Sequence, residues 1–559
     1  MIESIYRTRE EWIERYQIGP YSENLELQDY DKSRPVAKCR NGLFVGNMEN
    51  DVAVWKGIPY AKAPEGELRF KRAQDPEDSD KVYDASYYGL SCLQPDSAEE
   101  TSSTYGQGED CLRLNLWANT TCKDTNKPIL VFIHGGGWAS GGTADPLHDG
   151  YNFVYYNPEM IFVTITYRFN VMGLVNLSSF PDGSEYETSV NNGLYDQAQA
   201  LKWLHDNAEA FGGDPNNITI AGESAGGGSV SALCLMEDAR KYFQKAIPMS
   251  GSVSQPNEMS KTYALPEALK KDFGAKTVAD LQKIPFDELK SWWTENQNAV
   301  YHLCVRDGKA LSEDPFADWC RGVTKDLVIM QGHTTNEFQY YQHLFGDNAA
   351  LYDAICDCVL ESQRESGSDE FKKNLDDYSK ALLALGYTED DIKREYMSDR
   401  SLAIGNTYQA TAHADNGGKG YFYLFDQPYD GVMAQYGAAH AVDLCYFFGN
   451  FDGDRGDGTK EEVELSRRFQ RMITNFCLNG DPSCDGLTWP AYDRENRYTM
   501  IIGPNMRVEK NPEKERVEAA LKMIDTHPKF RYLESFASIF PMVAERHPEV
   551  LGINPTEIE

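Results

Sequence analysis

Short apolar runs alternate with longer stretches of mixed polarity along much of the chain. Residues 129–133 and 160–166 are continuous apolar runs, which is typical of strands that are buried on both faces of a sheet. Between residues 196 and 211, apolar side chains recur every three or four positions and would share one face of a helix, which the pair Gly212-Gly213 ends. This alternation predicts an α/β fold with a mostly parallel twisted sheet flanked by helices, in which ligands bind at the carboxyl ends of the strands.

Segments of different composition divide the remaining sequence. We expect residues 1–38, which are polar and aromatic, to form an N-terminal extension, and residues 39–559 to form one large domain. Residues 256–325 and 345–400 are richer in charged, aromatic and helix-forming residues, so we expect helical insertions that form a lid over the sheet. Further strands are expected at residues 218–221, 245–249, 326–330 and 420–425.

Charge and composition narrow the classes of partner. The formal net charge of −33 disfavours nucleic acids and anionic membranes as partners. The apolar runs are of strand length, which predicts no membrane span. The first ten residues lack the pattern of a signal peptide, so we expect a cytoplasmic protein, or a secreted one whose signal has been removed. Twelve cysteines in 559 residues do not indicate a disulfide scaffold.

The strongest chemical motif is the turn Gly222-Glu223-Ser224-Ala225-Gly226, which reads G-x-S-x-G. A β-branched run at 218–221 precedes it, and small residues at 227–233 can open a helix after it. A serine on such a strand-to-helix turn exposes its hydroxyl to a cleft, and the flanking glycines avoid a clash in the bend. The turn therefore predicts the nucleophile elbow of an α/β-hydrolase fold.

A serine nucleophile needs a base and an acid, which follow it in this fold in the order Ser, then Asp or Glu, then His. His440 lies among small residues that would let a substrate approach, and Glu337 follows the expected strand at 326–330. We predict Ser224 as nucleophile, His440 as base and Glu337 as the acid that orients it. Read alone, His440 also fits a structural histidine in a loop and Glu337 a surface glutamate.

A glycine turn after an apolar strand supplies candidate donors for an oxyanion. His134-Gly135-Gly136-Gly137-Trp138 follows the run at 129–133 and matches an HGGG-type motif. We predict that the backbone N–H groups of Gly136, Gly137 and Ala225 form the oxyanion hole. This chemistry needs no metal or organic cofactor. His333 and Glu337 are spaced like a pair of metal ligands, but nothing supplies a third ligand.

Together these motifs resemble the type-B carboxylesterase family, which includes cholinesterases and some fungal lipases. Residues 40–495 carry matching stretches, among them Glu109-Asp110-Cys111-Leu112-Arg113-Leu114-Asn115, Phe211-Gly212-Gly213-Asp214-Pro215 and Trp489-Pro490-Ala491-Tyr492. The resemblance implies the same catalytic residues and the same oxyanion donors as the motifs do. It also implies a disulfide between Cys92 and Cys111 and an ion pair between Arg69 and Glu109.

The resulting expectation is a serine carboxylic-ester hydrolase that acts through an acyl-enzyme on small to medium esters. Two alternatives are a lipase for longer-chain esters and a non-catalytic cholinesterase-like binding protein. Residues 93–110 contain no tryptophan of the kind that captures choline, which disfavours choline esters. The charged stretch 369–400 is unlike the apolar lid expected of a lipase. The sequence leaves the natural ester and the oligomeric state open.

Overall fold

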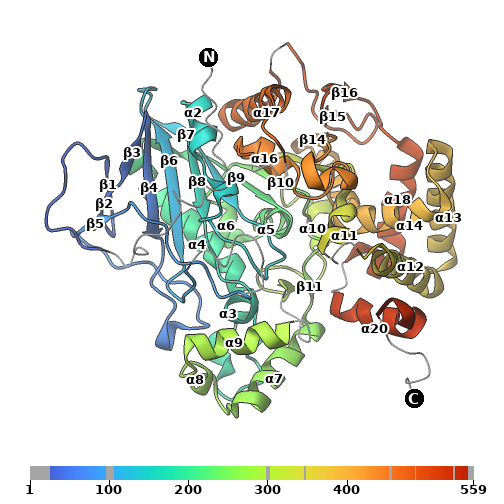
Figure 1. Cartoon of the computed structure of the whole chain (residues 1–559), viewed down its shortest axis with the longest axis horizontal. Helices are drawn as coiled ribbons and strands as arrows, with labels where there is room; N and C mark the ends of the chain where they lie inside the picture. Colours follow the sequence, from blue (N-terminus) through green and yellow to red (C-terminus); the bar gives the residue numbers. More distant parts are fainter. Residues whose placement is uncertain are drawn as a thin grey trace.

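A large twisted sheet forms the centre of the computed structural model, which describes residues 25–95, 106–297, 303–344, 348–451, 456–484, 486–532 and 536–551 (Figure 1). This 11-stranded sheet has the order β16-β15-β14-β13-β10-β9-β7-β8-β6-β4-β3. Its strands are β3 (Asn47–Glu49), β4 (Val52–Pro59), β6 (Arg113–Asn119), β7 (Lys127–Ile133), β8 (Ile161–Ile165), β9 (Gly213–Glu223), β10 (Lys245–Met249), β13 (Val328–Thr334), β14 (Lys419–Phe425), β15 (Thr499–Ile502) and β16 (Arg507–Glu509).

Parallel pairing runs through the middle of this sheet, from β8 across β7, β9, β10, β13 and β14 to β15. Antiparallel strands complete both sides, β6, β4 and β3 on one and β16 on the other. The mostly parallel sheet and all six expected strands are therefore confirmed. Because parallel strands end at the same edge, the loops after β7, β9 and β13 lie on one side of the sheet.

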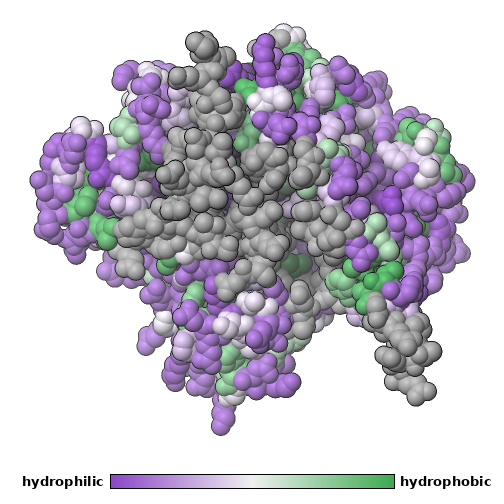
Figure 2. Space-filling model, in the orientation of Figure 1, coloured by the Kyte–Doolittle hydropathy of each residue, from purple (hydrophilic) through white to green (hydrophobic). Residues whose placement is uncertain are grey.

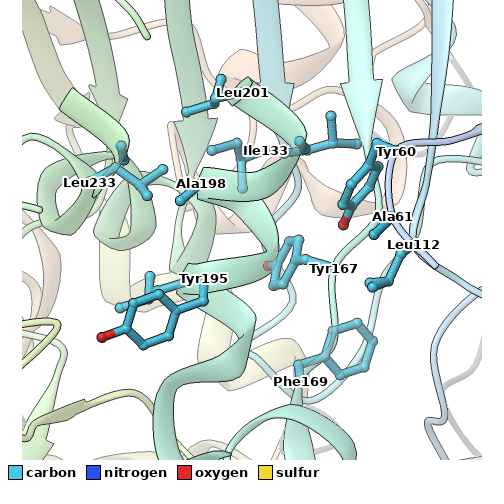
Figure 3. Packing of buried hydrophobic residues seen from close by; sticks show 14 of the residues in the cluster. Tyr60, Ala61, Leu112, Ile133, Tyr167, Phe169, Tyr195, Ala198, Leu201 and Leu233 are labelled. Carbon is cyan, nitrogen blue, oxygen red and sulfur yellow. The ribbon is translucent and has the colours of Figure 1, made fainter. Parts of the chain in front are cut away.

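Alternating side chains of the buried strands enter two separate cores. In β7, Ile129, Val131 and Ile133 join a core that includes α4 (Asn192–Asn207) and α5 (Ala225–Leu233). Figure 3 shows Ala198 and Leu201 of α4 packed near Ile133. Leu130 and Phe132 join the other core, with α2 (Tyr151–Tyr156), α16 (Asp443–Phe448) and α17 (Lys460–Asn479). Helices thus cover both faces of the sheet, as expected.

The other described elements are shorter or lie outside the main sheet. They are the strands β1 (Val36–Cys39), β2 (Gly42–Val45), β5 (Val82–Asp84), β11 (Asn257–Glu258) and β12 (Val305–Arg306), and the helices α3 (Asn170–Gly173), α6 (Glu237–Arg240), α7 (Ala264–Phe273), α8 (Val278–Leu281), α9 (Phe286–Asn296), α10 (Pro315–Cys320), α11 (Tyr340–Leu344), α12 (Ala349–Ser366), α13 (Asp369–Leu385), α14 (Glu389–Ser398), α15 (Ile404–Asp415), α18 (Lys514–Thr526), α19 (Pro528–Arg531) and α20 (Phe536–Arg546).

The described part of the N-terminal extension begins at residue 25, and residues 1–24 lie outside the described residues. Strand β1 already begins at Val36 and pairs with β2 in a small three-stranded sheet. The expected boundary after residue 38 therefore falls inside a strand. Only Ala37 and Cys39 of β1 are buried, so the alternation of apolar and polar residues in this segment is short. The sequence therefore gave little indication of a strand here.

Both insertions are helical, as expected. Residues 256–325 contain α7, α8, α9 and α10, and residues 345–400 contain α12, α13 and α14. The second group packs with α18 and α20 around a third core, which Figure 1 shows to one side of the sheet. Phe338, the residue after Glu337, lies in this third core. Whether either insertion acts as a lid stays a prediction.

Polar side chains dominate the face of the molecule in Figure 2, with apolar residues scattered between them. Large exposed apolar side chains among the described residues include Leu383 and Leu385 on α13. Within the part of the chain that the structure describes, no helix combines the length and the apolar character needed to cross a membrane.

Candidate active site

The predicted elbow is a sharp turn between β9, which ends at Glu223, and α5, which begins at Ala225. Ser224 has φ 59° and ψ −124°, and its N–H donates to the carbonyl of Met249 on β10 at 3.0 Å. A Cβ on Gly226 would lie 2.1 Å from the carbonyl oxygen of Ile133. The bend is thus closed to larger residues at Gly226, and it leaves Ser224 partly exposed.

The predicted acid and base lie in direct contact. His440 Nδ1 is 2.5 Å from Glu337 Oε2, and both side chains are buried. Glu337 begins a short 3₁₀-helix after β13, and His440 lies in the loop before α16. The N–H of Asn336 donates to the carbonyl of Ala438 at 2.8 Å, which joins the two loops. The order of residues in the sequence therefore identified a pair that meets in space.

Two further groups hold the other carboxylate oxygen of Glu337. The Ser250 hydroxyl and the Thr334 N–H both donate to Oε1, at 2.5 and 2.8 Å. Ser250 directly follows β10 and has a φ of 46°, and its own N–H donates to Gly332. Sequence analysis did not single out Ser250, although its position one residue after an expected strand at the same sheet edge was a usable signal.

Glu223, the residue before Ser224, contacts the other side of the imidazole. Its Oε1 lies 3.2 Å from His440 Nε2, which places the elbow backbone next to His440. Asp443, on the first turn of α16, is fully buried and accepts a hydrogen bond from the Tyr423 hydroxyl at 3.2 Å. Glu223 was not predicted as part of the site, because nothing in the local sequence shows that it meets His440.

These carboxylates set the protonation of the site. Burial alone would lower the pKa of His440, but Glu223 and Glu337 more than offset it and raise the pKa to about 9. Burial would raise the pKa of Glu337, yet the charge and hydrogen bond of His440 hold it below its usual value. Burial and the charge of Glu337 raise the pKa of Asp443 to about 7. The site therefore favours a charged imidazole next to an ionised Glu337.

The predicted oxyanion donors lie on a loop that runs beside the elbow. Gly136 and Gly137 have φ values of 95° and 63°, and both are exposed. A Cβ on Gly135 would lie 3.1 Å from the Cβ of Ser224, so the loop and the nucleophile are neighbours. Ala225 opens α5, where the first backbone N–H groups have no acceptor within the helix. The HGGG loop and the start of α5 thus both lie beside Ser224, and the role of the three N–H groups as oxyanion donors stays a prediction.

The cysteine pair differs from the disulfide that the resemblance implied. Cys92 and Cys111 are both buried free thiols. Hydrogen bonding to Cys92 and burial hold the pKa of the Cys111 thiol well above its usual range. Because disulfide exchange proceeds through the thiolate, this environment slows oxidation of the Cys111 thiol. Residues 96–105 of the loop between them, including Tyr105, lie outside the described residues, whereas the implied ion pair between Arg69 and Glu109 is present.

Potential metal ligands are the next feature of the site. No group of three or more His, Cys, Asp or Glu side chains among the residues that the structure describes could hold a metal ion. His333, the residue spaced four positions before Glu337, has its Nδ1 2.9 Å from the carbonyl oxygen of Thr334. The arrangement supports acyl transfer by a buried acid–base pair, a partly exposed serine and a row of backbone donors.

Known proteins share both sequence and fold with this chain. A family model described as the carboxylesterase family matches residues 33–520. Para-nitrobenzyl esterase of Bacillus subtilis is 35% identical over 501 residues, which cover 86% of this chain and 97% of that protein. Acetylcholinesterase of Bungarus fasciatus is 28% identical, over 84% of this chain and 83% of that protein. A solved Geobacillus stearothermophilus carboxylesterase superposes with a TM-score of 0.77 at 29% identity, over 87% of this chain and 100% of that one.

Proposed function

Because the chain belongs to the carboxylesterase family and has the α/β-hydrolase fold of its relatives, we propose how its residues hydrolyse carboxylic esters. Ser224 Oγ attacks the ester carbonyl carbon while His440 Nε2 takes the hydroxyl proton. Glu337 accepts the Nδ1–H bond and stabilises the imidazolium that forms. The observation that supports these roles best is the 2.5 Å contact between His440 and Glu337 beside the elbow.

The remaining steps use the same groups. Backbone N–H groups of Gly136, Gly137 and Ala225 stabilise the negative oxygen of the tetrahedral intermediate. His440 then gives its proton to the leaving alcohol, and the acyl group stays on Ser224. Water attacks this acyl-enzyme with His440 again as base, the carboxylic acid leaves, and the proton returns to Ser224.

Small to medium esters are the substrates we propose. Helix α13 and the residues that follow it, 369–400, carry many charged side chains. A lipase for long-chain esters would instead need a broad apolar surface next to its site. Hydrolysis of p-nitrophenyl acetate, butyrate and laurate tests this preference: we expect kcat/KM to be highest for one of the two shorter esters, and a maximum at laurate would favour a lipase.

Substitution of the nucleophile tests the mechanism. We expect Ser224→Ala to lower kcat for p-nitrophenyl butyrate by about a thousandfold or more, because no nucleophile remains to form the acyl-enzyme. Ser291→Ala is the matched control, since Ser291 is exposed on α9 and its hydroxyl donates to the carbonyl of Asp287 in the same helix. If Ser224→Ala retains the activity of the unmodified chain, the nucleophile is assigned wrongly. If the unmodified chain hydrolyses none of the esters, the non-catalytic alternative holds.

A further inference from the structure

The loop that carries Gly136 and Gly137 has backbone conformations that its internal hydrogen bonds alone do not keep in place. Gly136, Gly137, Trp138 and Gly141 all have positive φ values, from 54° to 108°. Inside the loop, the carbonyl of Gly136 accepts bonds from the N–H groups of Ala139 and Ser140, both at 3.0 Å. These bonds close a turn but do not fix its orientation relative to Ser224. Contacts from outside the loop must supply that orientation.

The Gln94 side chain supplies the most complete of these contacts. Its Oε1 accepts the N–H of Gly141 at 3.0 Å, and its Nε2 donates to the carbonyl of Gly141, also at 3.0 Å. A side-chain amide thus pairs with both backbone groups of one residue, as a neighbouring strand would. The Gln94 side chain is completely buried, so water cannot replace either bond without a void.

Gln94 is itself firmly held. Its Nε2 also donates to the carbonyl of Cys92 at 3.2 Å, and its backbone N–H donates to Gln107 Oε1 at 3.0 Å. Ser91 and Gln107 form an isolated β-bridge next to it. These bonds fix the position of the Gln94 amide, and the amide in turn fixes the position of the loop.

Asn170 braces the middle of the same loop. Its backbone N–H donates to the carbonyl of Trp138 at 3.1 Å, and its side-chain amide donates to the carbonyl of Leu93. Trp138 is also anchored through its indole N–H, which donates to Ser229 on α5 at 3.0 Å. The loop is therefore fixed at Trp138 and at Gly141, and Gln94 holds the end that is farther from strand β7.

We propose that Gln94 is a positioning residue for ester hydrolysis, which acts by holding the Gly136 and Gly137 N–H groups where the oxyanion forms. This inference rests on the proposed function for its kinetic consequence, but not for its structural one. A displaced donor weakens transition-state stabilisation more than substrate binding, because the oxyanion exists only after attack. Loss of the two Gln94–Gly141 hydrogen bonds therefore lowers kcat and leaves KM nearly unchanged.

Two substitutions separate the bonds of Gln94. Gln94→Met keeps the length of the side chain and removes both bonds to Gly141. Gln94→Glu keeps the shape and the acceptor, but an ionised carboxylate cannot donate to the Gly141 carbonyl. We expect kcat for p-nitrophenyl butyrate to fall about tenfold or more in both variants, with KM changed less than twofold, since loss of one oxyanion donor costs about 10²–10³ in kcat.

The Gln94→Glu variant carries a pH signature that a purely structural role would not produce. A buried carboxyl has a raised pKa, so it is protonated in mildly acidic buffer and can donate again. We expect the ratio of variant to unmodified kcat to rise as the pH falls from 8 to 5.5. A trifluoromethyl ketone forms a tetrahedral adduct that places an oxyanion in the hole. The ratio of its affinity for the variant to its affinity for the unmodified chain should rise in the same way as the pH falls.

Gln363→Glu is the matched control. Gln363 on α12 is also completely buried, donates to the Lys529 carbonyl at 3.1 Å and accepts from the Tyr396 hydroxyl. It packs in the third core, so its loss should lower the melting temperature without a pH-dependent change in the kcat ratio. If Gln363→Glu reproduces both the kcat loss and the pH signature, the effect is general destabilisation and the proposal is wrong.

Hydrogen exchange provides a readout that does not need activity. We expect the backbone amides of residues 135–142 to exchange faster in Gln94→Met than in the unmodified chain, and no faster in Gln363→Glu. Unchanged exchange together with kcat within twofold of the unmodified chain overturns the proposal. If the unmodified chain hydrolyses no ester, the proposed function fails, and the exchange comparison still decides whether Gln94 holds the loop.

Discussion

Three carboxylates, those of Glu223, Glu337 and Asp443, raise the pKa of a single buried imidazole, His440. Glu337 is the partner that orients it, through the 2.5 Å bond to Nδ1. Glu223 lies on the opposite side, 3.2 Å from Nε2, where the serine proton would arrive. The imidazole must be neutral to accept the serine proton. The negative charge around it therefore raises the pH at which the site becomes active.

We predict that the kcat/KM of the unmodified chain rises with pH until His440 is deprotonated, with a midpoint near its pKa of about 9. Glu223→Gln removes one negative charge, which lowers the pKa of His440. The midpoint of the rise in kcat/KM then moves to lower pH by about one unit or more. The midpoint of a kcat/KM profile against pH measures the shift. Glu237→Gln, an exposed substitution on α6, should leave the midpoint in place. A midpoint in Glu223→Gln that stays at the same pH, or moves to higher pH, contradicts this account.

Helix α17 illustrates how an element is specified by its ends as well as by its face. Thr459 and Glu462 form a capping box, in which each side chain bonds the backbone N–H of the other. Gly480, with a φ of 66°, ends the helix in the left-handed conformation that favours glycine. Between these ends, Phe469, Ile473 and Phe476 enter the core beneath the sheet.

We predict that Thr459→Ala lowers the free energy of unfolding by about 1 kcal/mol, because the orphan N–H groups of the first turn lose their acceptor. The midpoint of urea denaturation measures the loss. Thr459→Ser, which keeps the hydroxyl, should restore most of the stability, and kcat should not change in either variant. Equal midpoints for the alanine and serine variants would show that the cap does not matter here.

Periodicity predicted elements well where burial is regular and poorly where it is not. The expected helix at 196–211 begins earlier, at Asn192, and tightens to a 3₁₀-helix from Ala208. The strand expected at 218–221 extends over Gly213–Glu223, because β7 pairs with Gly213 as well as with residues 218–222, with an irregularity in register between them. The pairing of Gly213 joins residues far apart in the sequence, so no local window of the sequence contains it.

The candidate site was predictable for a different reason. A G-x-S-x-G turn, an HGGG turn and the order of acid and histidine are local or ordinal features, so Ser224, Glu337 and His440 could be found without coordinates. Gln94 could not, because its role depends on contacts with a residue 47 positions away in the sequence. For Ser250 the sequence offered its position after a strand, but not its bond to Glu337, which lies 87 positions away. Supporting contacts of this kind form only after the chain has folded.

At the scale of the whole molecule, one arginine joins the C-terminal helices to the second insertion. Arg516 on α18 donates to Glu395 on α14 at 2.7 Å, to Asp399 at 3.0 Å and to Glu513 at 2.7 Å. Asp399 begins a π-helix at Asp399–Ala403, directly after Ser398, whose hydroxyl accepts the N–H of Phe338. Residues beyond 500, for which the sequence suggested no role, are thus connected to the loop of Glu337.

We predict that Arg516→Met destabilises the chain by about 3–5 kcal/mol, because it leaves the carboxylates of Glu395 and Asp399 buried without their cation. Chemical denaturation followed by circular dichroism measures the loss, and limited proteolysis should cut within α12–α14 first. Arg507→Met is the control: Arg507 is half exposed and pairs with Glu509 at the surface, where a salt bridge contributes about 1 kcal/mol at most. A similar loss in both variants would mean that burial of the Arg516 cluster is unimportant.

The backbone of Ser224 has a consequence for how this chain can change. A residue other than glycine at φ 59° and ψ −124° holds about 1–3 kcal/mol of unfavourable conformational energy. Glycine adopts this conformation without that cost, so Ser224→Gly releases the energy and at the same time removes the nucleophile. Selection of random variants for heat resistance alone would therefore enrich inactive chains at this position, so activity has to be screened alongside thermal tolerance in any attempt to make the protein more robust.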